Sequence, residues 1–165
     1  MSVIIRPRTE TDLDACAAAL RHVHEIDHYP QDWPADPAGW LSPPKLLAAV
    51  VADRDDAVVG HIGLGTSHNT PKVVRESAGT ETVVSVIRLY VLPDARRAGV
   101  GSRLLTEAAR MAASWGQRAV LTVASDSTAA IALYERHGWR HVHSGPGGWR
   151  TADGREARMR YYVGP

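Results

Sequence analysis

Apolar residues along the chain recur with two different periods, which divide the chain into short strands and helices. Runs of β-branched and other apolar residues predict strands, whereas apolar residues three and four positions apart predict amphipathic helices. The predicted strands cover residues 3–5, 46–52, 57–64, 82–92, 118–124, 139–144 and 157–163. The predicted helices run from about Thr9 to Tyr29, from 99 to 115 and from 128 to 136. This order of elements indicates an α/β fold with α+β character.

Three segments show neither period and predict connections. Residues 29–44 hold five of the chain's ten prolines and two tryptophans, which is typical of an ordered lid with short helical turns. Residues 69–80 are polar and predict a loop. A Gly-rich loop at 145–156 is expected between the last two strands.

Length and composition limit the classes of function. A chain of 165 residues with 44% apolar and 22% charged residues suits one globular domain, predicted here as 1–165. The formal net charge is +1, and the basic residues are spread along the sequence without a Lys-rich tail or stripe. Nucleic acid is therefore not an expected partner. The N-terminus reaches charge and proline too early for a signal peptide or a membrane span, and Cys16 is the single cysteine. We therefore expect a cytoplasmic protein with no membrane partner.

The most specific chemical signal is Arg96-Arg97-Ala98-Gly99-Val100-Gly101, between a predicted strand and a predicted helix. The first N–H groups of a helix lack intrahelical partners, and the helix dipole adds positive potential there. Glycines let a pyrophosphate approach such a backbone closely. The spacing suits neither a Walker loop nor a dinucleotide fingerprint, because neither lysine follows a glycine and Leu104 stands where the fingerprint has Gly or Ala.

Residues 89–101 (Leu-Tyr-Val-Leu-Pro-Asp-Ala-Arg-Arg-Ala-Gly-Val-Gly) resemble the Arg/Gln-x-x-Gly-x-Gly/Ala motif of the GNAT superfamily of N-acetyltransferases. A second stretch, 127–139, is similar to that family's Asn-x-x-Ala-x-x-Leu-Tyr-x-x-x-Gly-Phe, with Ser127 in place of the usual Asn. The resemblance implies the GNAT fold, which has a central mixed, mostly antiparallel sheet. The sheet is splayed between its fourth and fifth strands and flanked by about four helices.

The resemblance also implies acetyl-CoA as the cosubstrate. Its pantetheine arm would lie between the strands at 83–92 and 118–124, with the thioester oxygen held by an N–H near Val91 and the pyrophosphate at 97–102. The implied cofactor-binding residues are Leu89, Tyr90, Val91, Arg96, Arg97, Ala98, Gly99, Val100, Gly101, Ser102, Ser127, Ala130 and Leu133.

Catalytic and acceptor-binding residues are implied in the same way. Tyr134 is the expected general acid, because the leaving thiolate must gain a proton. Family members often carry Glu at the position aligned with Ser85. The base therefore stays open, and the candidates besides water are Ser85, Glu81, Glu25, Asp27, His28 and Asp32. The acceptor, a small primary amine, is expected at the first helix and the lid. The implied acceptor-binding residues are Asp27, His28, Tyr29 and Trp33. Acids and aromatic rings there would suit a cation.

Two other functions stay open at this point. A chain without the strand carboxylate also suits a GNAT-like module that binds acyl-CoA as a sensor or docking unit without turnover. His24-Glu25-Ile26-Asp27-His28 matches the His-Glu-x-x-His motif of zinc proteases, but Pro30 ends the helix at once and no further ligand is evident, so no metal is expected. The expected partners are acetyl-CoA and an amine, and a homodimer is left open.

Overall fold

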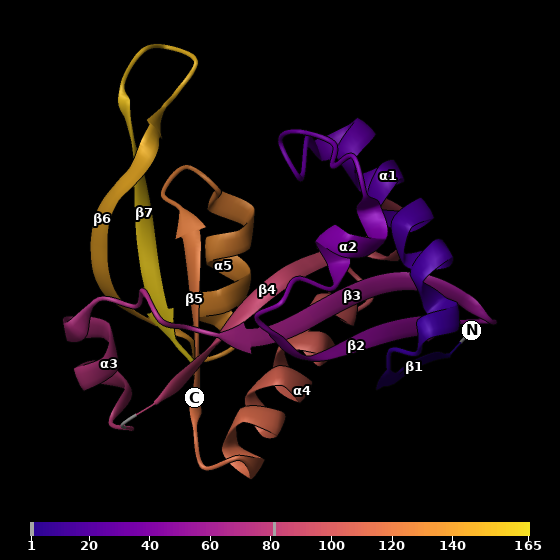
Figure 1. The fold of residues 1–165 in the computed structure, drawn as a ribbon, viewed down its shortest axis with the longest axis horizontal. Coiled ribbons are helices and arrows are strands. Elements are labelled where there is room, and N and C mark those ends of the chain that lie inside the picture. Colours follow the sequence, from indigo (N-terminus) through magenta and orange to yellow (C-terminus); the bar gives the residue numbers. More distant parts are fainter. Residues whose placement is uncertain (1, 81) are drawn as a thin grey trace. The chain divides into compact units, whose positions relative to one another are not determined.

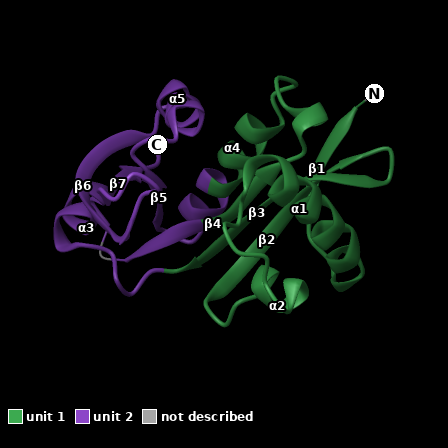
Figure 2. Cartoon of the chain, turned by 90° about the horizontal axis from the view of Figure 1, so that it is seen from above, with its two compact units in different colours: residues 1–66, 87–108 green, residues 67–86, 109–165 purple. Residues whose placement is uncertain are grey.

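The computed structural model describes residues 2–80 and 82–165, which fall into two compact units (Figures 1 and 2). Residues 1–66 and 87–108 belong to the first unit, and residues 67–86 and 109–165 belong to the second. One strand and one helix, β4 (Val83–Val91) and α4 (Val100–Ser114), contribute residues to both. The assignment of 1–165 to one domain stays a prediction.

Seven strands and five α-helices occur in the described residues. The other strands are β1 (Val3–Pro7), β2 (Leu46–Arg54), β3 (Ala57–Thr66), β5 (Arg118–Ala124), β6 (Arg140–Arg150) and β7 (Glu156–Val163). The other helices are α1 (Leu13–Asp27), α2 (Pro37–Leu41), α3 (Lys72–Ala78) and α5 (Thr128–Arg136), with 3-10 turns η1 (Glu10–Asp12) and η2 (Pro93–Ala95). No helix within 2–80 and 82–165 has the length and apolar character needed to cross a membrane.

The strand order is β1-β2-β3-β4-β5-β7-β6. The β1–β2, β2–β3, β5–β7 and β6–β7 pairs are antiparallel, whereas β4 and β5 are parallel. The parallel ladder joins Val83–Ser85 to Arg118–Val120, and both strands continue beyond it. The predicted mixed, mostly antiparallel sheet is therefore confirmed. The short ladder fits the splay expected between the fourth and fifth strands.

The first unit buries one face of α1 against its own strands. Four residues at helical spacing form this face, and the remaining members of the cluster come from α2, β2, β3 and β4. The buried residues are Cys16, Ala19, Leu20, Val23, Leu41, Val51, Val58 and Tyr90. Each large apolar side chain buried in this way contributes about 1.5–3 kcal/mol. The packing holds the first helix against the strand that precedes the Gly-containing connection.

Residues 72–78 form α3, and the predicted loop at 69–80 is wrong over this part. Val74 and Ala78, which lie four positions apart, are buried with Val83, Val120 and Val163 in the core of the second unit. The helix ends at Gly79, which has φ 71. Only one narrow face of α3 is apolar, so its average composition resembles that of a loop.

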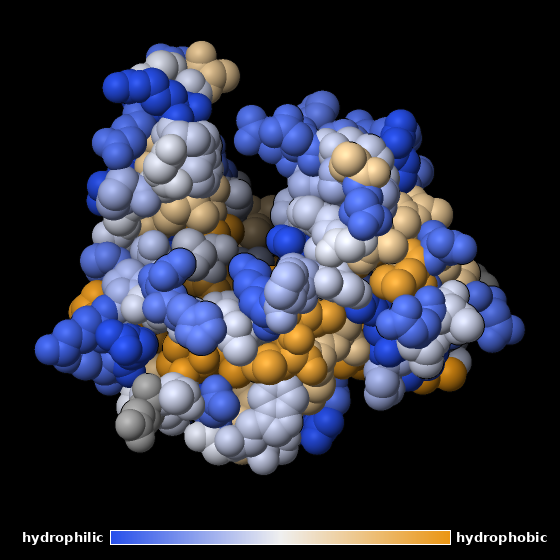
Figure 3. Space-filling view, in the orientation of Figure 1, coloured by the Kyte–Doolittle hydropathy of each residue, from blue (hydrophilic) through white to orange (hydrophobic). Residues whose placement is uncertain are grey.

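The Gly-rich segment at 145–150 is also a strand and not a loop. β6 pairs with β7 through Gly145 and Pro146, shifts register, and pairs again at Arg150 with Glu156. β6 is at one end of the strand order, so one of its edges has no neighbouring strand to hydrogen-bond with. A proline, which has no N–H to donate, can be tolerated there. The connection is thus shortened to 151–155. The tip of this hairpin is largely hydrophilic (Figures 1 and 3).

Candidate functional site

The connection from β4 to α4 turns at two residues with left-handed backbone. Arg97 has φ 68 and Gly99 has φ 77, and α4 then begins at the buried Val100. A Cβ on Gly99 would meet no atom within 4 Å, so there is room for a side chain. Glycine is favoured here by the left-handed backbone conformation. The Arg103 N–H donates to the Gly99 carbonyl at 3.0 Å and closes the first turn of the helix. This turn offers its earlier N–H groups to an anion.

Three arginines around this connection differ in their partners. Arg96 donates from Nε to the Val91 carbonyl at 3.1 Å and pairs with Asp27 at the end of α1. Arg103 donates from Nη1 to the Val3 carbonyl at 2.6 Å. The exposed Arg97 side chain makes no hydrogen bond or ion pair with any described residue. Arg97 is therefore the guanidinium that can move most freely toward a phosphate.

The last residues of β4 alternate between the core and the other face of the strand. Tyr90 is 4% exposed, and its hydroxyl donates to the Cys16 carbonyl of α1 at 2.9 Å. Burial raises the pKa of Tyr90 well above its usual value, so the phenol stays protonated. Leu89 and Val91 are half-buried on the opposite face. The Tyr90 side chain is thus an anchor in the core, and only its backbone can serve a cofactor.

His61 of β3 is fully buried between two fixed partners. Its Nδ1 lies 2.8 Å from the Arg88 carbonyl oxygen, which can only accept, and its Nε2 lies 3.0 Å from Nη1 of Arg8, which can only donate. The imidazole is therefore neutral with its proton on Nδ1. Burial lowers the pKa of His61 to about 4. With both nitrogens engaged, His61 cannot serve as the base in a reaction.

Tyr29, Trp40 and Arg88 meet in the first unit, beside the loop that follows α1. The rings of Tyr29 and Trp40 pack edge to face, with centroids 6.0 Å apart and planes at 73°. The Arg88 guanidinium carbon lies 3.9 Å from the Trp40 ring centroid. Burial raises the pKa of Tyr29 to about 12. Arg88 is not among the predicted site residues, although it is the single charged residue of the 83–91 strand and was a detectable signal.

Two of the acids near this cluster already have partners. Asp27 pairs with Arg96, and Asp36 accepts the Gly39 N–H at 3.1 Å at the start of α2. The protein's own guanidinium covers one face of Trp40. The acidic, cation-binding surface that composition suggested therefore stays a prediction, and two of its acids are already engaged within the protein.

The His-Glu-x-x-His match does not form a continuous helical motif. His28 caps α1 with left-handed φ 57, and His24 directs Nδ1 to the Pro30 carbonyl at 2.6 Å. His24 also contacts Trp33, with ring centroids 5.4 Å apart. Among the described residues, no group of three or more His, Cys, Asp or Glu side chains could hold a metal ion. The helical zinc-protease arrangement is therefore absent from 24–28.

The second unit holds Tyr134 in an aromatic cluster. The half-buried Tyr134 of α5 lies 6.5 Å from Trp139 and 6.1 Å from Tyr162, measured between ring centroids. The Tyr162 hydroxyl donates to Glu135 at 2.7 Å. Burial and this bond to a carboxylate raise the pKa of Tyr162. The cluster fixes the ring of Tyr134 on the helix.

The remaining predicted residues of the second unit lie on α5 and β4. Ser127 is the N-cap position of α5, and Ala130 and Leu133 are half-buried on the helix. Ser85 is half-buried in the parallel ladder opposite Val120. Glu81, the other candidate base, lies outside the described residues. The structure thus groups Ser85, Ser127, Ala130, Leu133 and Tyr134 in this unit and the phosphate connection in the first.

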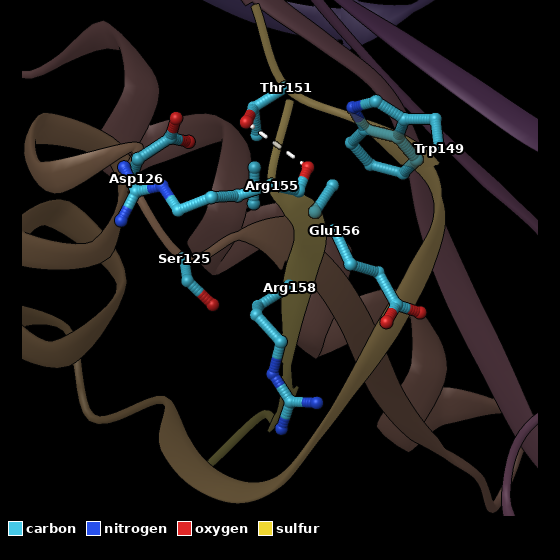
Figure 4. Close-up of a pocket in the computed structure, with 9 residues that line it drawn as sticks. Ser125, Asp126, Trp149, Thr151, Arg155, Glu156 and Arg158 are labelled. Atoms are coloured by element: carbon cyan, nitrogen blue, oxygen red, sulfur yellow. Dashed lines mark hydrogen bonds between the residues drawn. The ribbon is translucent and has the colours of Figure 1, made fainter. Parts of the chain in front are cut away.

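A pocket of about 280 Å³ lies in the second unit (Figure 4). It is formed by the end of β5 and the outer part of the β6–β7 hairpin. The lining residues are Ala124, Ser125, Asp126, Trp149, Thr151, Arg155, Glu156, Ala157 and Arg158. Thr151 Oγ1 donates to the Arg155 carbonyl at 3.1 Å across the hairpin turn. The sequence does not predict this pocket, because its walls lie about thirty residues apart and form no motif.

The chain is similar to known proteins in sequence and in fold. A family model described as the Acetyltransferase (GNAT) family matches residues 13–139. An N-acetyltransferase from Staphylococcus aureus Mu50 is 18% identical with a TM-score of 0.75, over 99% of this chain and 98% of its own. The ribosomal-protein-S18-alanine N-acetyltransferase from Escherichia coli is 20% identical with a TM-score of 0.72, over 99% of this chain and 94% of its own.

A third similar structure is that of Arabidopsis thaliana NAA60 in complex with acetyl-CoA. It is 18% identical with a TM-score of 0.75, over 98% of this chain and 97% of its own. At these identities the likeness concerns the fold. The search of curated proteins found no significant match.

Proposed function

Because the chain belongs to the GNAT acetyltransferase family, we propose that it transfers the acetyl group of acetyl-CoA to a primary amine by direct attack of the nitrogen. The observation that carries this proposal is the connection from β4 to α4. Left-handed Arg97 and Gly99 stand immediately before the first turn of a 15-residue helix, at the position of the family's phosphate motif. A pyrophosphate would be held there by backbone N–H groups, with help from the exposed Arg97.

The backbone at the end of β4 would hold the reacting thioester. In the proposed reaction the amine nitrogen forms a bond to the thioester carbon, and the carbonyl oxygen gains negative charge. An N–H near Val91 would donate to that oxygen and stabilise it more in the transition state than in the ground state. Tyr90 supports this role, because its side chain ties the strand to α1 through the Cys16 carbonyl. A fixed strand keeps the donor preorganised.

Tyr134 is the proposed general acid. When the carbon–sulfur bond breaks, the thiolate of CoA leaves and takes the phenolic proton. The position of Tyr134 in the second motif supports this role, and its contacts with Trp139 and Tyr162 restrict its ring. The proton that the amine must lose would pass to water or to a nearby side chain. Ser85 would not be the final acceptor of this proton, because its hydroxyl can only relay it. His61 does not qualify, since both of its nitrogens are engaged.

Calorimetric titration of acetyl-CoA tests the proposal, with Gly99→Glu as the test variant and Gly116→Glu as its control. Both glycines have left-handed φ, 77 and 71, and neither would crowd a Cβ. They lie just beyond opposite ends of α4. We expect micromolar binding by the wild type and by Gly116→Glu, and loss of binding by Gly99→Glu.

The same titration, combined with an acetylation assay, distinguishes an enzyme from an acyl-CoA-binding module without turnover. If the wild type binds acetyl-CoA but acetylates no amine in a broad panel, the chain is an acyl-CoA-binding module, as the serine at position 85 would allow. If the wild type does not bind acetyl-CoA, or if both glutamate variants lose binding equally, the proposed cofactor site is wrong.

A further inference from the structure

Arg88 is a half-buried guanidinium without an acidic partner. It interrupts the apolar run of β4, and no carboxylate of the described residues lies within 4.0 Å of it. Burial lowers the pKa of Arg88, as expected for a cation withdrawn from water. A charge that loses hydration is usually compensated by a counter-ion or by several hydrogen bonds. Within the described chain, Arg88 has no counter-ion and makes one side-chain hydrogen bond, from Nε to the Trp40 carbonyl oxygen.

The guanidinium is nevertheless held in a defined position. Nε donates to the Trp40 carbonyl oxygen at 2.9 Å, and the planar group lies over the Trp40 ring at 3.9 Å. Nη1 and Nη2 form no hydrogen bond with the described residues. The two terminal nitrogens are therefore left for a ligand, and the stacking has already removed much of the side chain's freedom. Such preorganisation reduces the entropy that binding costs.

The backbone of Arg88 is held as firmly as its side chain. Arg88 has φ 54, a conformation that strands rarely contain, and its carbonyl accepts the Nδ1–H of His61. His61 in turn accepts from Arg8, which also donates to the Leu41 carbonyl at 2.9 Å. Because His61 is neutral, this group carries the two positive charges of Arg8 and Arg88. Tyr29 is neutral as well and adds no negative charge.

From this geometry we propose that Arg88 binds the carboxylate of the acceptor, so that the acceptor is a free amino acid or a similar small amine with a carboxylate. The fork of Nη1 and Nη2 matches the two oxygens of a carboxylate, which it can bind in a bidentate manner. Arg88 directly precedes Leu89 and lies roughly 10 Å along the strand from Val91, so the anion site and the proposed thioester site share one strand. This inference rests on the proposed acetyl transfer and narrows its substrate class.

The experiment compares L-amino acids with their carboxamides, which keep the amine and lose the charge. Turnover with acetyl-CoA gives kcat and KM, and calorimetry on the CoA-saturated protein gives Kd for each acid and amide. Arg88→Met keeps an apolar side chain over Trp40 but removes the fork, and Arg88→Lys keeps the charge alone. Arg21→Gln is the matched control, because Arg21 also lies over a tryptophan ring but is paired with Glu25 at 3.2 Å.

We expect the kcat/KM of the wild type to be about ten- to hundredfold higher for at least one acid than for its amide. One charged hydrogen-bonded pair can produce a difference of this size. Arg88→Met should lose that preference through a higher KM, Arg88→Lys should keep part of it, and Arg21→Gln should retain it. The affinity for acetyl-CoA should stay the same in all three folded variants, as checked by circular dichroism.

Three results would overturn the assignment. In the first, the wild type has the same kcat/KM for acids and for their amides. In the second, Arg88→Met lowers kcat/KM equally for acids and amides. In the third, Arg88→Met no longer binds acetyl-CoA, in which case the guanidinium binds a phosphate of the cofactor. A failure of acetyl transfer itself would be recognised separately, because the wild type would then either bind no acetyl-CoA or bind it and acetylate no amine in the panel. The difference between acid and amide in direct binding to the cofactor-free protein would still decide the role of Arg88.

Discussion

The carboxylate of Asp12 accepts two hydrogen bonds from the guanidinium of Arg6, at 2.8 and 2.9 Å. Asp12 also accepts the Thr9 N–H at 2.7 Å, at the turn that starts α1. These bonds hold the pKa of Asp12 well below its usual range, and the Arg6 bond is the largest cause. One side chain thus joins β1 to the beginning of the helix that carries the proposed acceptor site.

Asp12→Asn should therefore destabilise the protein by about 1–3 kcal/mol at pH 7, because a charged hydrogen-bonded partner and a helix cap are both lost. The pKa of Asp12 is depressed in the folded state, so its contribution is complete above the unfolded pKa of about 3.9 and is lost as the pH falls further. Urea unfolding at pH 7 and at lower pH measures this difference. The exposed Asp14→Asn serves as the control, and equal effects of the two substitutions would contradict the prediction.

His61 should make the stability depend on pH in a second window. Burial depresses the pKa of the folded-state imidazole to about 4, so between about pH 6.5 and pH 4 the unfolded chain binds a proton that the folded chain does not. Stability should fall as the pH decreases through this window, by about 3 kcal/mol in all, and level off below it.

His61→Gln should remove that dependence, whereas His22→Gln, at an exposed position of α1, should keep it. Urea unfolding at half-unit pH intervals provides the measurement. A wild-type profile with the same slope as that of His61→Gln would show that His61 is not the group responsible.

Tyr134→Phe should lower kcat at least about tenfold and leave the Kd for acetyl-CoA almost unchanged, because it removes a proton donor and keeps the ring. Tyr161→Phe is a suitable control, since Tyr161 is a half-buried tyrosine of the same unit that packs against His143. Steady-state kinetics and calorimetry measure the two quantities. An unchanged kcat would remove Tyr134 from the mechanism.

Arg97→Gly should weaken the binding of acetyl-CoA without lowering the stability of the fold. The substitution removes an exposed positive charge next to the proposed pyrophosphate site and also relieves a left-handed non-glycine residue, whose strain is of order 1 kcal/mol. We expect weaker acetyl-CoA binding, most clearly at low salt, with unchanged or slightly higher stability. Thermal unfolding and titrations at two salt concentrations test both parts. Unchanged affinity would indicate that Arg97 does not contact the cofactor.

Local signals in the sequence determined much of the fold and the position of the phosphate connection. The strand at 118–124 and the helix at 128–136 have the predicted limits, because their periodicity and end signals lie within a few residues of one another. α4 begins at Val100, one residue after the predicted start at Gly99, since a helix start after a strand is also a local feature. The family follows from two such local motifs.

Only the tertiary structure decided the identity of α3, the extent of β6 and the surroundings of Arg88. α3 depends on a core formed by residues from β4, β5 and β7, and Pro146 is tolerated because β6 ends the strand order. The contacts of His61 with Arg88 and Arg8 join residues 27 and 53 positions apart. Burial and charge pairing arise from such distant contacts, so periodicity cannot predict which guanidinium is left without an acid.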